Sequence, residues 1–109
     1  MNSHWKIFTN AEDFKKAGKV LKWVLDQIGS EYDLPNIEEY HKGGFVCSFK
    51  IEEVSTEWER VVFSTIEKAQ LIGRSWSLNG DIDSELDLWS SESTISGVSN
   101  MQVSICKNA

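Results

Sequence analysis

The spacing of apolar residues predicts two strands and two helices in the first two thirds of the chain. Residues 4–8 and 44–52 alternate between apolar and polar positions, as β-strands with one buried face do. Residues 10–28 and 56–72 repeat their apolar positions every three or four residues, as amphipathic helices do. The helical stripes are Phe14, Ala17, Leu21, Val24, Leu25 and Ile28 in the first and Trp58, Val62, Ile66 and Ala69 in the second. Residues 30–43 are polar and rich in turn formers, so we expect a loop there.

Short polar signals mark the ends of both predicted helices. Capping-box spacings stand at Thr9 with Glu12, at Asn10 with Asp13 as an equally good register, and at Thr56 with Glu59. Gly29 and Gly73 follow the last apolar position of each helix, where a left-handed residue commonly ends the element.

The last third of the chain changes to strand and turn chemistry. Asn79-Gly80 is a strong hairpin signal, and the stretches 85–90 and 101–106 alternate as strands. The predicted order is β-α-β-α-β-β-β, which indicates an α+β two-layer sandwich with both helices on one face of a mixed, mainly antiparallel sheet of about five strands. We expect the first two strands to be parallel neighbours and the last three to form an antiparallel meander.

Composition places the chain among small acidic globular proteins. Its 109 residues and 40% apolar content fit one domain over residues 1–109 and exclude the disordered class. No apolar run is long enough to span a bilayer, and the first residues lack a secretory signal, so we expect a cytoplasmic protein without membrane contact. A formal net charge of -6 argues against nucleic acid as the direct ligand.

The two cysteines, Cys47 and Cys106, lie far apart in strand-like runs. They form no Cys-x-x-Cys pair, so neither zinc nor a thioredoxin-like redox motif is indicated. We expect two buried, reduced thiols, with a disulfide left open if their strands are neighbours. No cofactor is predicted.

Acidic residues gather in the last third without compensating cations. Residues 75–109 hold only Lys107 as a base, and Asp81, Asp83, Glu85 and Asp87 are spaced by two. If the stretch is extended throughout, all four carboxylates point to one side of the sheet, with Trp89 next in line. Trp89 is therefore the best candidate for an exposed aromatic contact, while most of Trp23, Trp58 and Trp76 should be core.

Three interpretations of these acids stay open. They form a solvated strand face that opposes edge aggregation, or a recognition surface for a basic partner anchored by Trp89, or a calcium loop. The calcium pattern starts at Asp81 and ends at Glu92, but Leu86 occupies the position that needs glycine. We therefore predict no metal site.

Catalytic signatures are scarce. His41 lies beside Tyr40 and close to Glu38 and Glu39, so a general base is conceivable there, but a lone loop histidine is more often only solvated. No nucleophile elbow or phosphate-binding glycine loop occurs. The lysines of the first helix, Lys15, Lys16, Lys19 and Lys22, are diluted by nearby acids. We expect no enzyme.

The stretch from Gly73 to Ile82, with Leu88-Trp89 and Ser96-Gly97-Val98 after it, resembles small acidic bacterial immunity proteins of contact-dependent growth inhibition and other polymorphic toxin systems. The resemblance implies an inhibitor that binds a basic toxin C-terminal domain, often a nuclease. On physical grounds we expect the contact residues to be Asp81, Asp83, Glu85, Asp87, Trp89 and Glu92. The alternative is a small α+β module that binds a ligand or oligomerises without catalytic activity.

Overall fold

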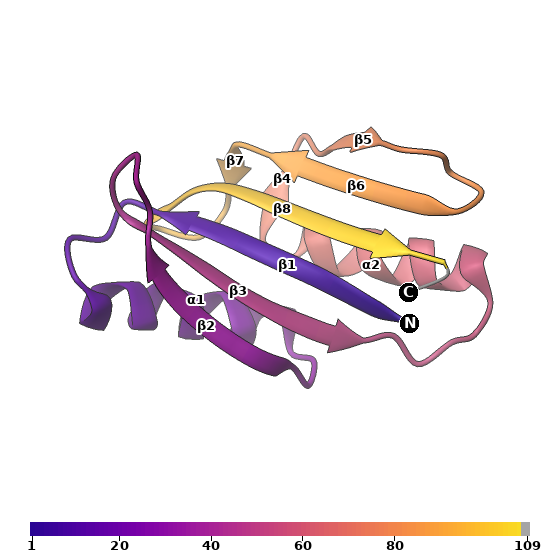
Figure 1. The fold of residues 1–109 in the computed structure, drawn as a ribbon, viewed down its shortest axis with the longest axis horizontal. Coiled ribbons are helices and arrows are strands. Elements are labelled where there is room, and N and C mark those ends of the chain that lie inside the picture. Colours follow the sequence, from indigo (N-terminus) through magenta and orange to yellow (C-terminus); the bar gives the residue numbers. More distant parts are fainter. Residues whose placement is uncertain (108–109) are drawn as a thin grey trace.

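The computed structural model describes residues 1–107 as ten elements of an α+β fold. In chain order they are β1 (Asn2–Thr9), α1 (Phe14–Ile28), β2 (Asp33–Glu39), β3 (Phe45–Glu52), α2 (Trp58–Gln70), β4 (Gly73–Arg74), β5 (Ser77–Asn79), β6 (Glu85–Ser90), β7 (Glu92–Ser93) and β8 (Val98–Cys106). Six strands form one sheet in the order β2-β3-β1-β8-β6-β5, and β4 pairs with β7 in a small second sheet (Figure 1). The predicted fold class is confirmed.

All neighbouring strands run antiparallel, so the expectation of a mixed sheet is wrong in that detail. β1 and β3, predicted as parallel neighbours, pair antiparallel from Asn2–Glu52 to Thr9–Phe45. The cause is β2, which follows α1 and turns back into β3. This extra strand reverses the chain before β3 enters the sheet. The predicted meander of the last strands is confirmed, since β5, β6 and β8 are consecutive antiparallel neighbours.

β2 lies within residues 30–43, where a loop was predicted. It is an edge strand in which Ile37 is half-buried and the other side chains are exposed, so no apolar alternation marks it. Leu34 has a positive φ of 52° beside Pro35, and the register with β3 shifts between Asp33 and Asn36. Proline and an irregular register are typical of edge strands, and they also hide a strand from pattern analysis.

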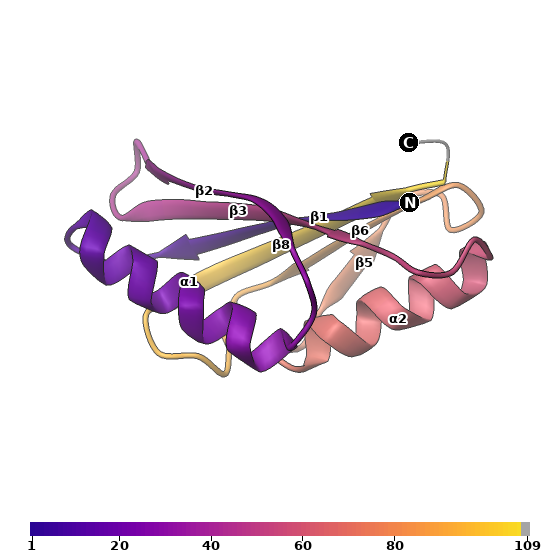
Figure 2. The same cartoon turned by 90° about the horizontal axis from the view of Figure 1, so that it is seen from below.

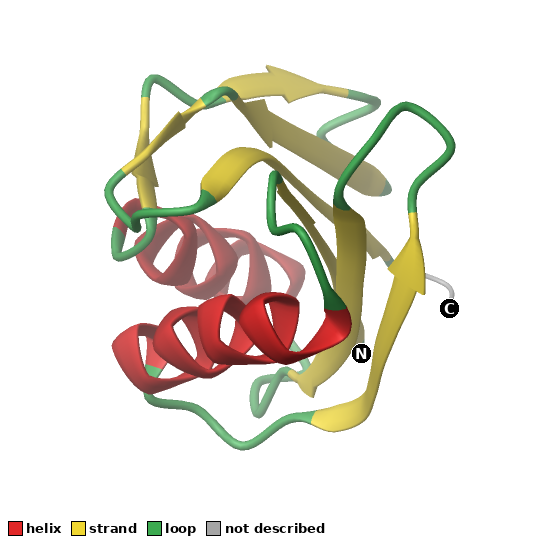
Figure 3. Cartoon of the chain, turned by 90° about the vertical axis from the view of Figure 1, so that its left-hand side faces the viewer, coloured by secondary structure: helices red, strands yellow, loops and turns green. Residues whose placement is uncertain are grey.

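Both helices pack on the same face of the sheet, as predicted (Figure 2). The sheet curves around them when viewed end on (Figure 3). Alternate residues of the central strands supply the sheet side of the core: Trp5, Ile7, Phe45, Cys47, Phe49, Ile51, Leu86, Leu88, Met101, Val103 and Ile105. Trp5 stacks on Phe49 with their ring centroids 5.8 Å apart. The strand period therefore directs one face to the core and the other to solvent.

The helix ends differ from the predicted caps. α1 starts at Phe14 because the Asp13 carboxylate accepts a hydrogen bond from the Lys16 N–H at 2.9 Å, so neither Thr9 nor Asn10 is the N-cap. Gly29 ends α1 in the left-handed conformation, as expected.

The second helix begins and ends at other residues than the sequence suggests. Glu57 is its N-cap without a side-chain bond, so the predicted cap at Thr56 is wrong. α2 stops at Gln70, before Gly73. Gly73 belongs to β4, where a Cβ would lie 2.5 Å from the Met101 Cε atom, so close packing explains this glycine.

The predicted hairpin forms, but with a longer turn than Asn79-Gly80 alone. β5 pairs with β6 through Ser77–Trp89 and Asn79–Asp87, and residues 80–84 connect the strands. Gly80 takes a φ of 108°, which suits glycine.

A buried ion pair fixes the end of β3 to α2. Lys68 Nζ lies 2.7 Å from a Glu53 carboxylate oxygen, and the Glu53 side chain is 1% exposed. The other Glu53 oxygen accepts from Ser3 Oγ at 3.0 Å, and Ser3 Oγ accepts from Trp5 Nε1 at 2.8 Å. Every polar atom of this network therefore has a partner, as burial requires.

The two cysteines lie on opposite faces of the sheet. Cys47 is fully buried, and burial raises the pKa of its thiol to about 11. Cys106 is exposed and free, so the expectation of a second buried thiol is wrong. Neither helix in the described chain is long and apolar enough to cross a membrane.

Candidate partner-binding face

The sheet face opposite the helices is the candidate site. No described helix or strand covers it, and it turns toward the viewer in Figure 1. Its residues are those that alternate with the core positions on β1, β3, β6 and β8. Because directly paired residues in adjacent strands share a face, the register identifies which side chains lie side by side.

Two rows of polar side chains cross the middle of this face. In one row His4 of β1 pairs with Ser104 of β8, and Ser104 pairs with Asp87 of β6. In the next row, Lys6 pairs with Gln102 and Gln102 with Trp89. We call this six-residue surface the open face.

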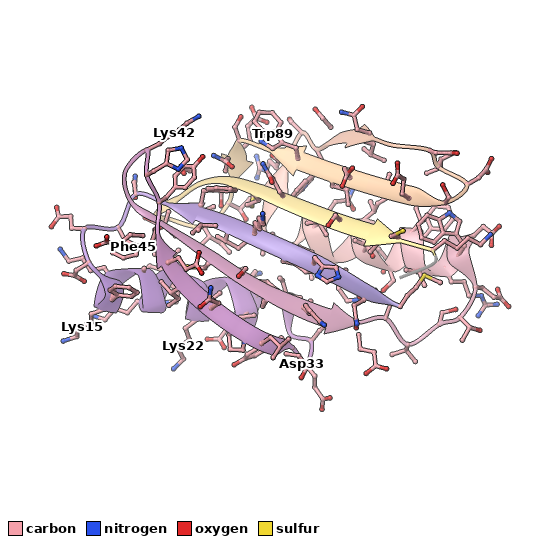
Figure 4. All side chains as sticks on the ribbon, in the orientation of Figure 1. Lys15, Lys22, Asp33, Lys42, Phe45 and Trp89 are labelled. Atoms are coloured by element: carbon pink, nitrogen blue, oxygen red, sulfur yellow. The ribbon has the colours of Figure 1, made fainter. Side chains whose placement is uncertain are left out.

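A hollow of about 290 Å³ lies between these rows, and all six residues of the open face line it. Trp89 is 45% exposed and is the one large apolar side chain among the six residues of the open face. Its ring stands at the β6 side of the open face (Figure 4). The hollow is lined only by residues of three neighbouring strands, and no helix covers it, so it suits a protruding side chain of another macromolecule better than an enclosed ligand.

Of the six predicted contact residues, the structure brings three together on one surface. Glu85, Asp87 and Trp89 alternate along β6 with the buried Leu86 and Leu88. Their positions agree with the predicted extended strand over this half of the acidic stretch. Trp89 also has the exposure that the sequence predicts.

Asp81 and Asp83 do not continue this line, so the prediction of four aligned carboxylates is wrong. They belong to the turn before β6, where the Asp81 carboxylate accepts from the Asp83 N–H at 3.2 Å. The Asp81 carbonyl accepts from the N–H groups of Ser84 and Glu85 at 2.8 Å each. An aspartate that bonds the backbone two residues ahead favours a turn over a strand, and this local bonding ends the extended segment.

Glu92 is also separate from the other candidates. It lies in β7, opposite Arg74 of the small sheet. Its own N–H donates to the hydroxyl of Ser90, which in turn donates to the Arg74 carbonyl. The calcium pattern therefore has no structural counterpart, because Asp81, Glu85 and Glu92 occupy a turn and two different strands. Within residues 1–107, no three His, Cys, Asp or Glu side chains gather in a way that could hold a metal ion.

None of these five acids takes part in an ion pair within the described chain. The three ion pairs of residues 1–107 are Lys16–Glu12, Arg60–Glu57 and Lys68–Glu53. Lys6 and His4 lie two strands from Trp89 and Asp87, roughly 10 Å away at the usual strand spacing. Lys6 and Asp87 lie in adjacent rows and are therefore farther apart than this, so at about 0.1 M salt, where the Debye length is about 10 Å, their mutual attraction is largely screened. The open face thus has a cationic side on β1 and an anionic side on β6.

Further carboxylates lie at the end of the molecule where β6 begins, on β3 and at the start of α2. The register places Glu52 and Glu85 in the same end row of the sheet, because Asn2 faces Glu52 and Cys106 faces Glu85. Trp58 Nε1 donates to the Ile82 carbonyl at 2.6 Å, which holds the start of α2, with Glu57 and Glu59, against the 80–84 turn. These neighbours come from distant segments, so sequence spacing could not group them.

Sequence reasoning missed the contribution of β1 to the site. On β1 and β8, the polar residues of the site alternate with core residues: His4 and Lys6 on β1, and Gln102 and Ser104 on β8. This alternation was the sequence signal that these side chains face away from the core. His41, the candidate general base, is exposed in the β2–β3 turn with its ring 4.7 Å from that of Tyr40. Trp23 is 51% exposed on α1, against the expectation for that tryptophan.

Comparison of the chain with protein-family models, curated proteins and solved structures found no match.

Proposed function

We propose that this protein is a binding protein that captures a basic region of another protein through the β6 side of its open face. The observation that carries the proposal is Trp89, a half-exposed tryptophan on the same strand face as Asp87 and Glu85, which form no ion pair within residues 1–107. An aromatic anchor flanked by unpaired charge is typical of an interface hot spot.

The anchor contributes through burial. Covering the exposed part of Trp89 removes roughly 100 Å² of apolar surface from water, which contributes about 2–3 kcal/mol before ordering costs. The neighbouring carboxylates accelerate association with a cationic partner and slow it with an anionic one.

The charge pattern also orients the partner. With Asp87 on β6 and Lys6 on β1, a partner that places its cations over β6 and an acceptor over β1 fits in one orientation only. A rotated partner would bring a cation against Lys6, where like charges repel.

The resemblance to bacterial immunity proteins suggests the partner class. In that case the partner is a toxin C-terminal domain acting in the cytoplasm, and the β6 carboxylates occupy the cationic cleft that would hold substrate phosphates of a nuclease. The acidic composition and the absence of a recognised catalytic motif support a stoichiometric inhibitor.

The test first reads the neighbouring reading frame, where the proposal expects a large protein with a basic C-terminal domain, and then measures binding of that domain by titration and by protection of growing cells. Trp89→Ser should weaken binding at least about thirtyfold, as loss of a hot spot does. Asp87→Lys should slow association and reduce its dependence on salt.

Two matched variants serve as controls. Trp23→Ser removes an equally exposed tryptophan from α1, and Glu67→Lys reverses a charge on the exposed side of α2. Both should bind as the unchanged protein does. Equal binding by Trp89→Ser and Trp23→Ser would contradict the proposal, as would a stable homodimer that buries the open face.

A further inference from the structure

A second surface lies at the opposite edge of the sheet from Trp89. A groove of about 630 Å³ runs between α1 and β2. Its apolar lining comes from Leu21 and Leu25 of α1 and from Pro35 and Ile37 of β2, and Tyr32 lies at one end. Figure 4 shows Lys22 and Asp33 on this side of the molecule.

Gly18 of α1 lines this groove and, having no side chain, leaves space in it. It lies in the helix interior, where glycine weakens a helix relative to alanine. A Cβ atom at this position would meet only Ile37 Cδ1, at an ordinary 3.9 Å, and the residue has no positive φ. Neither packing nor backbone conformation therefore requires glycine here, and its structural effect is to leave the groove open.

The groove runs beside backbone groups that have no strand partner. β2 is an edge strand paired only with β3. The Tyr40 N–H donates to the Gly44 carbonyl at 3.0 Å, and antiparallel pairs alternate between bonded and non-bonded positions. Glu38 therefore directs its backbone toward β3, while Ile37 and Glu39 present theirs to the free edge. These groups can accept one more strand.

The segment that forms this edge is acidic, although Lys22 and Asp26 of α1 also line the groove and Lys50 of β3 faces Asp33. Glu31, Asp33, Glu38 and Glu39 occur between residues 31 and 39 without an intervening lysine or arginine. Tyr32 also lines a second hollow of about 580 Å³, together with Glu31, Asp33, Glu52, Glu53 and Val54. The apolar groove thus continues into an acidic hollow. Val54 there is fully exposed.

We propose that this groove binds an extended basic segment of a partner protein, which adds a strand to β2. The segment's apolar side chains fill the groove between Leu25 and Ile37, and its lysine or arginine side chains enter the hollow beside Glu31 and Asp33. A second copy of this chain fits poorly, because pairing two β2 strands would bring acidic edges together. The site shares no residue with the open face, so the proposal does not depend on the proposed function.

The test measures fluorescence anisotropy of short labelled peptides in which valine alternates with lysine. Two matched peptides replace lysine with glutamate or valine with serine. The valine–lysine peptide should bind at least about tenfold more tightly than either control, since both charge and apolar burial contribute. Amide shifts in an NMR titration should fall on β2 and α1.

Gly18→Leu fills the groove and should weaken peptide binding at least about tenfold, whereas Gly18→Ala, with a far smaller side chain, should retain most of it. A double variant, Glu31→Lys with Asp33→Lys, alters exposed side chains only and should also abolish peptide binding. This variant tests the proposal even if Gly18→Leu does not fold. Glu67→Lys, on the exposed side of α2, should leave peptide binding unchanged.

Several results would overturn this inference. They are absent binding, equal binding of the glutamate peptide, unaffected binding by a folded Gly18→Leu variant, shifts centred on the open face, and self-association through β2 in place of peptide binding.

Discussion

The two faces of the six-stranded sheet differ in whether their charged side chains form ion pairs. On the helix-covered face, the buried Glu53 carboxylate accepts hydrogen bonds from the Lys68 ammonium group and from the Ser3 hydroxyl. On the opposite face, Lys6 and Asp87 of the open face and the neighbouring Glu85 have no ion-pair partner in the described chain. Side chains alternate between the two faces along each strand. Charges on the covered face therefore stabilise the fold, and charges on the other face remain available to a partner.

This difference teaches where function can be changed without loss of structure. Adjacent residues of one strand, such as Leu88 and Trp89, belong to opposite faces. Substitutions on the covered face should alter the free energy of unfolding, and substitutions on the open face should alter binding. Matched pairs of residues on the two faces distinguish effects on the free energy of unfolding from effects on binding.

The largest effect is expected at the buried ion pair. Lys68→Met leaves the Glu53 carboxylate buried without its cation, which should lower the free energy of unfolding by about 3–5 kcal/mol. Lys50→Met makes the same chemical change on the open side of β3 and should change it by less than about 0.5 kcal/mol. Urea unfolding measures both, and equal effects would refute the distinction between the faces.

The next effect compares neighbours on β6. Leu88 is 1% exposed, so Leu88→Ala should destabilise the protein by about 2–5 kcal/mol through lost burial and a cavity. Trp89→Ala should cost less than Leu88→Ala, about 1–2 kcal/mol, because nearly half of this side chain already contacts water and its removal leaves no cavity in the core. Thermal and urea unfolding of the two variants provide the measurement. A larger loss for Trp89→Ala would mean that Trp89 serves the fold.

The central strands and both helices could be predicted because their residues meet the core on a regular period. Phe45, Cys47 and Phe49 alternate without interruption, and α1 repeats its apolar positions over its whole length. β2 could not be predicted, because an edge strand with one half-buried residue carries no such signal. Its omission also produced the wrong direction for β3 relative to β1.

The candidate site was predictable only along β6. Glu85, Asp87 and Trp89 share a face because local alternation continues through them. Asp81 and Asp83 left that line through backbone hydrogen bonding within the turn, which spacing alone does not reveal. The contribution of Lys6 and His4 depends on β1 lying beside β8, a pairing between opposite ends of the chain.

A smaller effect of opposite sign is expected at Gly18. Gly18→Ala replaces a helix-interior glycine without a steric conflict, since the added Cβ has 3.9 Å to its nearest neighbour. The variant should be more stable by about 0.5–1 kcal/mol. Gly73→Ala is the matched control, because its Cβ would lie 3.2 Å from the Glu92 carbonyl oxygen and would displace the buried Met101 side chain, so it should be destabilised. Urea unfolding measures both changes, because a shift in the midpoint at an unchanged m-value gives the change in the free energy of unfolding.

The smallest effect on stability concerns the two cysteines, which again lie on opposite faces. At pH 8, iodoacetamide should alkylate Cys106 in the native protein and leave Cys47 unmodified, because alkylation requires a thiolate in contact with solvent. Burial raises the pKa of Cys47 to about 11, so its thiol stays protonated and enclosed. Mass spectrometry of digested protein identifies the modified residue, and denatured protein should label at both positions. Cys106→Ser should shift the free energy of unfolding by less than about 0.5 kcal/mol. If Cys47 in the native protein is labelled as fast as Cys106, the covered face opens to solvent. That result would contradict the distinction between a closed face and an accessible one.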